Sequence, residues 1–346
     1  MNATPTGVLL VQLGTPAAPT PRAVRRYLRE FLSDPRVLDI PVLPRRLLLE
    51  TVILPTRPRR SAAAYKKIWT PEGSPLLVHS RALAESLARA LGPDYRVALG
   101  MRYGEPALGT ALKGLAAAGA LRVLVLPLFP QWAASSTGSA FARAAELAAA
   151  EWDPPELELL GPFWSEPGFV EAWHETAREP LAAFRPDHVL FSFHGLPERQ
   201  IRKSDPTGGH CLASADCCDA PPGEALARCY RAQCYATATA LAGALGAPGG
   251  AWSVAFQSRL GGTPWIRPYT DVRLPELAAA GVKRLAVLCP AFVADCLETL
   301  EEIGIRGREQ FRAAGGDDLL LVPSLNAHPV FAATLVAIVR RRAVQS

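Results

Sequence analysis

The chain has 346 residues, of which 49% are hydrophobic and 20% are charged. This length exceeds what one hydrophobic core usually serves and predicts two domains of ordinary size. The formal net charge of +5 is small and spread along the chain, so no nucleic-acid partner is expected. Apolar runs long enough for a transmembrane helix (~18 residues or more) do not occur. Residues 1–5 lack the basic and apolar regions of a signal peptide, and we expect a cytosolic protein.

The first expected elements are a buried strand and a helix. Residues 7–16 form an apolar run that ends in a Gly/Pro turn, as a buried strand does. Thr20 and Pro21 then supply an N-cap and a first-turn proline, which is a typical helix start. The apolar residues of this helix share one face: Val24, Tyr27, Leu28 and Phe31.

Residues 37–60 differ from their surroundings because apolar groups are interrupted by prolines and bracketed by arginines. Leu47–Leu49 and Val52–Leu54 lie between Arg45–Arg46 and the arginines at 57, 59 and 60. This composition suits a lip that contacts a membrane surface or an apolar ligand. An ordinary helix that buries its apolar face and solvates its arginines is the alternative.

Further apolar runs predict strands, and alanine- and leucine-rich helical segments lie between several of them. The predicted strands are Arg96–Met101, Arg122–Phe129, Leu157–Leu160, His188–Phe193, Trp252–Gln257, Arg284–Leu288 and Leu319–Val322. Strands that alternate with helices predict α/β domains with doubly wound parallel sheets.

The two halves of the chain resemble each other. The sequence Leu-Ala-Ala-Ala-Gly occurs at Leu115–Gly119 and again at Leu277–Gly281, each time just before a predicted strand. Upstream, Met101–Gly104 corresponds roughly to Gln257–Gly261. We therefore expect two similar domains, residues 1–170 and 171–346, that face each other across a cleft.

His194 stands where a central strand is expected to release its chain. It follows the apolar run 188–193, and Gly195 and Pro197 come directly after it. In open α/β sheets, ligands bind outside the carboxyl ends of the strands. A histidine there suits a bound metal ion or the acceptance of a proton, and a space-filling histidine is the alternative.

A second stretch, residues 289–302, also follows a predicted strand and opens a helix. Asp295, Glu298 and Glu302 have the spacing i, i+3, i+7, which predicts three carboxylates along one helix face. A row of hard oxygen ligands suits a divalent metal ion or a path for protons. Acidic residues in a first helical turn also favour the helix dipole, which is the purely structural alternative.

Seven short stretches of the chain match stretches of the ferrochelatase family and occur in the same order. Members of that family insert Fe(II) into a porphyrin. The stretches are Leu10–Pro16, Tyr65–Trp69 with Gly73–Pro75, Gly100–Tyr103, Pro127–Trp132 with Ser135–Ser139, Ser192–Pro197, Phe256–Arg259 with Pro264–Trp265, and Asp295–Glu302. Together they span nearly the whole chain, and the sequence therefore resembles a ferrochelatase. The resemblance implies a chelatase-type fold of two α/β domains.

The resemblance also implies roles for individual residues. His194 and Glu298 would be the catalytic pair, and Asp295 and Glu302 would continue an acidic line that handles metal or protons. Cys296 stands where some relatives have a histidine. The porphyrin-binding residues would be Leu13, Tyr65, Ser74, Arg102, Tyr103, Trp132, Ser135, Trp265 and Phe292.

Five of the seven cysteines fall within residues 205–234. Structural disulfides are not expected in a cytosolic chain. The segment resembles the insert with which some bacterial ferrochelatases hold a [2Fe–2S] cluster, and it implies the ligands Cys211, Cys217, Cys218 and Cys229. Cys234 is left out because clusterless relatives also have a cysteine on that helix. Four thiolates also suit Zn(II), which is the simpler alternative.

The function implied by the resemblance is insertion of Fe(II) into protoporphyrin IX with release of two protons. Gln12–Gly14 is more similar to the protoporphyrin-using branch than to the coproporphyrin III branch, where a tyrosine is common in place of Leu13. The rival interpretations are a chelatase for another tetrapyrrole or metal, and a haem or iron–sulfur carrier without turnover. The expected location is cytoplasmic, with peripheral membrane contact through residues 37–60.

Overall fold

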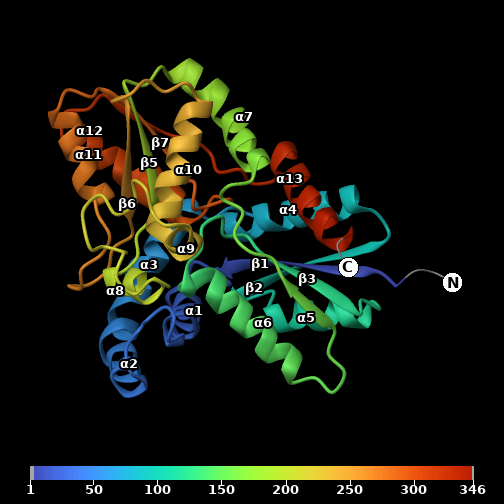
Figure 1. Cartoon of the computed structure of the whole chain (residues 1–346). Coiled ribbons are helices and arrows are strands. Elements are labelled where there is room, and N and C mark those ends of the chain that lie inside the picture. Colours follow the sequence, from blue (N-terminus) through green and yellow to red (C-terminus); the bar gives the residue numbers. More distant parts are fainter. Residues whose placement is uncertain (1–3, 345–346) are drawn as a thin grey trace. The chain divides into compact units, whose positions relative to one another are not determined.

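The computed structural model describes residues 4–344, so residues 1–3 of the N-terminal stretch considered above lie outside the described residues. The chain packs into two compact units (Figure 1). The first takes the described parts of Met1–Phe129, Ala134–Pro162 and Asn326–Ser346, and the second takes Pro130–Ala133 and Phe163–Leu325. The division expected from the sequence places residues 326–346 in the second domain, whereas their contacts group them with the first sheet.

The first unit is built on a parallel sheet with the strand order β2-β1-β3-β4. Its strands are β1 (Thr6–Gly14), β2 (Tyr95–Tyr103), β3 (Arg122–Pro127) and β4 (Glu156–Leu159). In the middle of β1, Val8 is aligned with Val97 on one side and with Leu124 on the other. The centre of β1 is buried on both faces, which explains why its sequence is a continuous apolar run rather than an alternating one.

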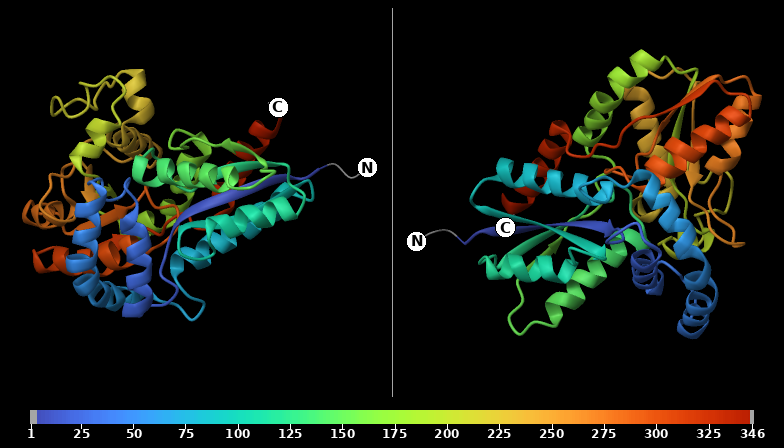
Figure 2. Two further views of the ribbon diagram at one scale, coloured as in Figure 1. Left: turned by 90° about the horizontal axis from the view of Figure 1, so that it is seen from below. Right: turned by 180° about the vertical axis from the view of Figure 1, so that it is seen from behind.

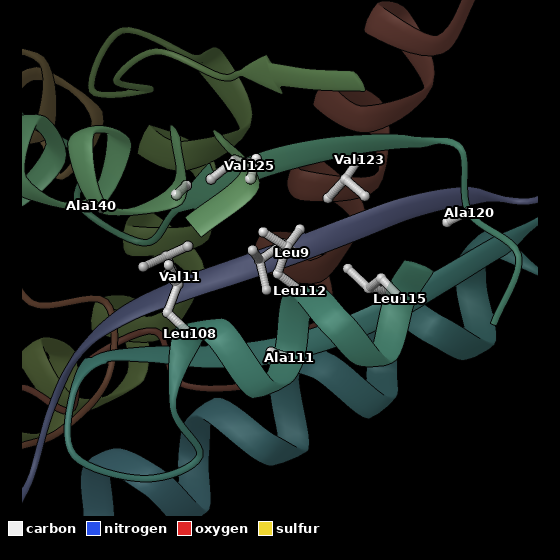
Figure 3. Close-up of a cluster of buried hydrophobic side chains, with 12 residues drawn as sticks. Leu9, Val11, Leu108, Ala111, Leu112, Leu115, Ala120, Val123, Val125 and Ala140 are labelled. Atoms are coloured by element: carbon white, nitrogen blue, oxygen red, sulfur yellow. The ribbon is translucent and has the colours of Figure 1, made fainter. Parts of the chain in front are cut away.

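Helices lie on both faces of this sheet (Figure 2). The helices of this unit are α1 (Pro21–Ser33), α2 (Val42–Leu48), η1 (Leu49–Ile53), α3 (Leu54–Ile68), α4 (Pro75–Leu91), α5 (Leu108–Ala117), η2 (Ala134–Gly138), α6 (Ser139–Ala149) and α13 (Pro329–Val344), where η marks a π-helix. Helices α5 and α6 pack on one face, and Leu9, Leu112 and Val123 belong to the core between them and the sheet (Figure 3). Truncating a leucine of such a core to alanine costs about 2–5 kcal/mol of stability.

The second unit has a parallel sheet with the order β6-β5-β7-β8. Its strands are β5 (His188–His194), β6 (Trp252–Gln257), β7 (Arg284–Leu288) and β8 (Asp318–Leu321). Its helices are α7 (Pro167–Phe184), α8 (Glu198–Lys203), α9 (Gly223–Arg228), α10 (Tyr230–Ala244), α11 (Thr270–Ala279), η3 (Glu298–Gly307) and α12 (Arg308–Ala313). Leu190, Leu285 and Phe311 lie in the core that α11, η3 and α12 close over this sheet. The predicted fold class, α/β with two doubly wound parallel sheets, is confirmed.

The two units repeat one topology, as the internal echo in the sequence predicts. Strands β1 to β4 and β5 to β8 have the same order, and the echoed segments lie at the ends of α5 and α11. Gly119 and Gly281 both have positive φ, of 87° and 93°. The next amide after each glycine donates to the carbonyl five residues before it, at 3.1 Å in one unit and 3.0 Å in the other. The repeated sequence therefore encodes the same glycine-ended helix stop in both units.

Helix α1 begins as predicted, because Thr20 Oγ1 accepts a hydrogen bond of 3.3 Å from the amide of Ala23. Cys289 directly follows β7 and is buried. No helix among residues 4–344 is both long and apolar enough to cross a membrane.

Candidate functional site

His194 is the last residue of β5, at the carboxyl edge of the second sheet. Its Nδ1 lies 2.6 Å from the carbonyl oxygen of Gly195. A carbonyl oxygen only accepts hydrogen bonds, so Nδ1 carries the hydrogen and Nε2 of the neutral ring keeps its lone pair. The rings of Trp265 and Phe292 flank the imidazole, with centroids 6.5 Å and 6.1 Å from its own. The predicted residues His194, Trp265 and Phe292 are thus neighbours in the second unit.

Glu302 lies on η3 and is held by the end of β6. The amide of Ser258 donates to one carboxylate oxygen at 2.9 Å, and the hydroxyl of Ser258 donates to the other at 2.5 Å. Gln257 Nε2 donates to the backbone carbonyl of Glu298 at 2.8 Å, which ties the first turn of η3 to the same strand. Gln257 and Ser258 belong to one of the stretches that resemble the family. Their contacts with Glu298 and Glu302 were not predicted from the sequence.

Burial raises the pKa of Glu302 above its ordinary value, and the negative charge of Glu298 raises it further. The hydrogen bond from Ser258 and the charge of His194 act in the opposite direction. Glu302 therefore interacts electrostatically with both Glu298 and His194. A carboxyl whose pKa is raised in this way holds a proton more readily than an exposed glutamate and can act as a proton acceptor.

Asp295 is not on the acidic helix. The helix begins after it, and η3 starts only at Glu298, so the expectation that Asp295, Glu298 and Glu302 share one helix face is wrong. Asp295 is buried and accepts hydrogen bonds from the hydroxyl of Thr299 at 3.1 Å and from the amide of Ser324 at 3.3 Å. The physical reason is that Thr299 Oγ1 also accepts from the amide of Cys296, and these bonds fix a loop where the spacing predicts a first helical turn.

In the first unit, Arg102 and Tyr103 belong to a buried polar network around Asp34. Arg102 Nη2 donates to Asp34 Oδ2 at 2.6 Å, the Ser139 hydroxyl donates at 2.5 Å, and the Tyr103 hydroxyl donates at 2.9 Å. Burial opposes the charge of Asp34, but the hydrogen bonds from Ser139, the Arg36 amide and Tyr103 lower its pKa below the ordinary value. Asp34 and Ser139 carry no sequence signal for this pairing because they are 105 residues apart.

The other predicted porphyrin residues of the first unit lie on separate elements. Ser74 precedes α4 and accepts a hydrogen bond of 2.8 Å from the hydroxyl of Thr15. Tyr65 is buried on α3. Leu13 lies near the end of β1, and Ser135 lies in the π-helix η2.

Trp132 belongs to the second unit, where α9 and α10 hold it. The guanidinium of Arg228 lies 4.1 Å from the Trp132 ring centroid, in a cation–π contact. The amide of Trp132 donates to Gln233 Oε1 at 2.6 Å, and Gln233 Nε2 donates to the carbonyl of Leu226 at 2.8 Å. Since Gln233 is fully buried, these bonds fix the position of the Trp132 backbone.

The four cysteines expected to bind a cluster come together between the insert and the start of α10. The sulfur atoms of Cys217 and Cys218 lie 3.9 Å apart. The thiols of Cys218 and Cys211 hydrogen-bond to Cys229, which is the N-cap residue of α10. The bond from Cys218, together with the amide of Ala232 and the bond from Cys211, lowers the pKa of Cys229 to about 6.

Asp205 organises the loop that carries Cys211. Its carboxylate accepts hydrogen bonds from the amides of Thr207, His210 and Cys211, at 2.9, 2.8 and 2.8 Å. The bond from Cys211 contributes most to lowering the pKa of Asp205 far below its ordinary value. His210 Nε2 lies 2.7 Å from the carbonyl oxygen of Cys217, which closes the loop on itself.

The sulfur chemistry of this group fits a tetrahedral metal centre. Two sulfurs on one tetrahedral metal lie about 3.8 Å apart when each metal–sulfur bond is about 2.3 Å, which is close to the separation of Cys217 and Cys218. Across residues 4–344, however, no group of three or more His, Cys, Asp or Glu side chains is arranged so that it could hold a metal ion. The thiols fit by type, number and proximity, and here they are hydrogen-bonded to one another.

The segment 37–60 has one buried and one exposed side. Leu49 and Leu54 are buried in a cluster with Leu32. Leu43 and Leu47, by contrast, are 78% and 65% exposed. The arginines differ too: Arg45 is buried and donates to the carbonyls of Leu38 and Ile40, while Arg46, Arg59 and Arg60 are exposed. The segment therefore buries part of its apolar surface and leaves another part exposed.

The comparisons with known proteins agree with the sequence motifs. The family model for ferrochelatase matches residues 5–343. The ferrochelatase of Azotobacter vinelandii is 51% identical over 333 residues, covering 96% of this chain and 98% of that protein. The ferrochelatase of Coxiella burnetii (strain Dugway 5J108-111) is 50% identical and covers 93% of this chain and 90% of its own length.

Among solved structures, SirB from Bacillus subtilis with Fe3+ matches with a TM-score of 0.54 at 12% identity, over 97% of this chain and 95% of that one. The sirohydrochlorin chelatase SirB from Bacillus subtilis subspecies spizizenii, in complex with cobalt, matches with a TM-score of 0.53 at 13% identity, over 97% and 94%. At this identity the structural likeness concerns the fold. The family match and the close relatives show that the chain belongs to the ferrochelatase family.

Proposed function

We propose that this protein is a ferrochelatase, an enzyme that inserts Fe(II) into protoporphyrin IX and releases two protons. The family membership supports the reaction class. The observation that carries the proposal is the geometry of His194, whose Nδ1 is engaged by the Gly195 carbonyl so that Nε2 is free to take a proton.

The reaction exchanges two N–H protons of the free porphyrin for one Fe²⁺ ion, so the charge of the macrocycle does not change. In our proposal, His194 Nε2 takes the pyrrole protons one at a time. Glu302 receives each proton in turn and passes it to water before the next arrives, because burial and the charge of Glu298 raise its pKa and favour its protonated form. Glu298 delivers the metal ion. Ser258 keeps the Glu302 carboxylate oriented during this exchange.

The aromatic rings around His194 support binding of a flat apolar substrate in the second unit. Trp265 Nε1 donates to the carbonyl of Leu260 at 2.9 Å, so its indole ring is held in place beside the imidazole. Trp132 is fixed through Gln233 and Arg228. We propose these rings as porphyrin contacts together with Phe292, and the first-unit residues named above as further contacts.

We also propose that Cys211, Cys217, Cys218 and Cys229 hold a [2Fe–2S] cluster. When bound, the cluster supplies a one-electron redox centre. The proximity of the four thiols supports this, since Cys211 and Cys218 hydrogen-bond to Cys229 and the sulfur of Cys217 lies 3.9 Å from that of Cys218. Zinc is the second candidate, and visible absorbance of the purified protein separates the two, because only the iron–sulfur cluster is coloured.

A peripheral membrane contact through residues 37–60 is our third proposal. Exposed Leu43, Leu47 and Val52 lie on consecutive turns of α2 and η1, and arginines of the same segment are exposed nearby. Apolar side chains with flanking cations are the usual composition of a helix that lies in a membrane interface.

The reaction is tested by an anaerobic absorbance time course of the purified protein with Fe(II) and protoporphyrin IX. Conversion of the free-base bands to those of haem supports the proposal. Porphyrin that binds without conversion contradicts it, and the same assay with coproporphyrin III and with Co(II) then identifies a different chelatase. A protein that turns over none of these, and whose Glu298→Gln variant binds porphyrin unchanged, is a carrier.

A further inference from the structure

Arg231 contacts two of the four cysteines. Its Nη1 lies 3.5 Å from the sulfur of Cys217 and 3.4 Å from the sulfur of Cys218. Its Nη2 donates to the carbonyl of Ala215 at 3.3 Å. One guanidinium therefore bridges the adjacent thiols and the backbone of the loop that presents them.

The position of this guanidinium is set by α10. Arg231 is on the first turn of the helix, two residues after Cys229, and its guanidinium lies 5.2 Å from the ring centroid of Tyr235 one turn later. Tyr235 also hydrogen-bonds to it. The half-buried side chain is thus held against the sulfurs by an aromatic ring behind it.

Backbone donors complete the surroundings of the sulfurs. The amide of Leu212 donates to the sulfur of Cys217 at 3.3 Å, and the amide of Ala232 donates to that of Cys229 at 3.5 Å. These amides are neutral, whereas Arg231 brings a full positive charge that no accessible pH removes. Hydrogen bonds from a charged donor are about twice as strong as neutral ones.

We propose that Arg231 raises the reduction potential of the cluster held by these cysteines, by donating hydrogen bonds to Cys217 and Cys218. The inference rests on the proposed [2Fe–2S] cluster. One-electron reduction adds a negative charge to the cluster and its thiolates. A fixed cation and hydrogen bonds at the sulfurs stabilise the reduced form more than the oxidised form, and net charge and hydrogen bonds to the sulfurs are among the factors that set such potentials.

The test is an anaerobic titration of the full-length protein with dithionite, followed by the electron paramagnetic resonance signal of the reduced cluster. Arg231→Gln should lower the midpoint by about 59 mV or more, which is a tenfold loss of reduced over oxidised cluster at a fixed potential. Arg231→Lys keeps the charge without the fork-shaped donor set, and its midpoint should lie between those of the wild type and Arg231→Gln. Arg228→Gln is the matched control, because it removes an equal charge from a side chain that stacks on Trp132, and its midpoint should stay near that of the wild type.

Tyr235→Leu covers the case in which Arg231→Gln loses its cluster. It keeps the arginine but removes the ring behind it, and it should lower the midpoint by a smaller amount. A coloured protein whose midpoint moves in neither Arg231→Gln nor Tyr235→Leu overturns the inference and leaves the cluster standing. A colourless wild-type protein overturns the cluster and the inference together.

Discussion

Ser258 donates two hydrogen bonds to the Glu302 carboxylate, one from its amide and one from its hydroxyl. It does so with a φ of 64°, in the left-handed region that side chains other than glycine seldom adopt. Backbone strain of this kind is typical of functional sites and persists where the surroundings enforce it. Here the strained backbone of Ser258 directs its amide to the Glu302 carboxylate, which would otherwise have fewer hydrogen-bond partners.

The raised pKa of Glu302 makes stability depend on pH. The contribution of Glu302 is fully present below the ordinary pKa of a glutamate and is lost as pH rises through the raised value, because ionisation then occurs in the buried site. Each unit of the raised pKa corresponds to about 1.4 kcal/mol. Glu302→Gln should remove this slope, which urea unfolding of the metal-free protein measures at pH values above the ordinary pKa of a glutamate. The control is Glu146→Gln, which removes an exposed ion pair with Arg143 and should leave the pH dependence of stability unchanged. If Glu302→Gln also leaves it unchanged, Glu302 does not have a raised pKa.

His194→Ala should lower the rate of haem formation by about 10²–10⁴-fold, the usual contribution of a general base. The fold should survive, because the side chain lies at the end of a strand. The control is His188→Gln at the opposite end of β5, where Nε2 contacts Ser253 Oγ at 2.8 Å. That variant should lose about 1 kcal/mol of stability and keep its turnover. Equal turnover in His194→Ala and the wild type would sink the proposed role of His194.

Asp34→Asn should destabilise the first unit by about 3–5 kcal/mol, because it leaves Arg102 without its carboxylate in a buried network. The matched control is Asp318→Asn, which breaks a paired but exposed contact with Arg308 and should cost less than about 1 kcal/mol. Urea unfolding measures both. At acid pH the difference between Asp34→Asn and the wild type should shrink, since the stability from Asp34 is lost as pH falls through its lowered pKa. Equal losses for the two variants at neutral pH would mean that the network is not what stabilises this unit.

Cys211→Ser should bleach the visible absorbance of the purified protein, because a cluster with three thiolates and a serine is less stable. Cys234→Ser, at a fully buried position on α10, should keep the spectrum. Iron and acid-labile sulfide, measured on the same samples, should follow the colour. A full spectrum in Cys211→Ser removes Cys211 from the ligand set.

The double variant Leu43→Asp/Leu47→Asp should reduce co-sedimentation with vesicles of anionic phospholipid, because it puts two charges into the exposed apolar surface of α2. Leu121→Asp/Trp152→Asp carries the same change of charge at two other exposed apolar residues and should sediment like the wild type. If both double variants sediment equally, the segment 37–60 is an ordinary surface helix.

Local patterns in the sequence were sufficient to predict most of the fold. Thr20 and Pro21 predicted the start of α1, and the repeated Leu-Ala-Ala-Ala-Gly predicted equivalent helix ends in two equivalent sheets. The acidic stretch was predicted less well. Its spacing was interpreted on α-helical geometry, but Thr299 fixes a loop around Asp295, and the residues after it form a π-helix.

The hydrogen-bond partners of the predicted site residues could not be predicted from a single sequence. Asp34 meets Arg102 across 68 positions, and Ser258 meets Glu302 across 44. Such pairings depend on strand order and on backbone angles, and neither leaves a trace in the spacing of residue types. The cysteine group was easier, because its members lie close together along the chain and share one chemistry.

Helix α13 packs on α4, and its Arg340 donates to the carbonyl of Ala90 at 3.0 Å, although the whole second unit lies between these two helices in the sequence. The second unit is therefore an insertion into the first. During synthesis, β5 to β8 and their helices are made before α13, which completes the first unit. We expect the second unit to finish folding before the first, because the first unit requires α13, which follows β8 in the sequence.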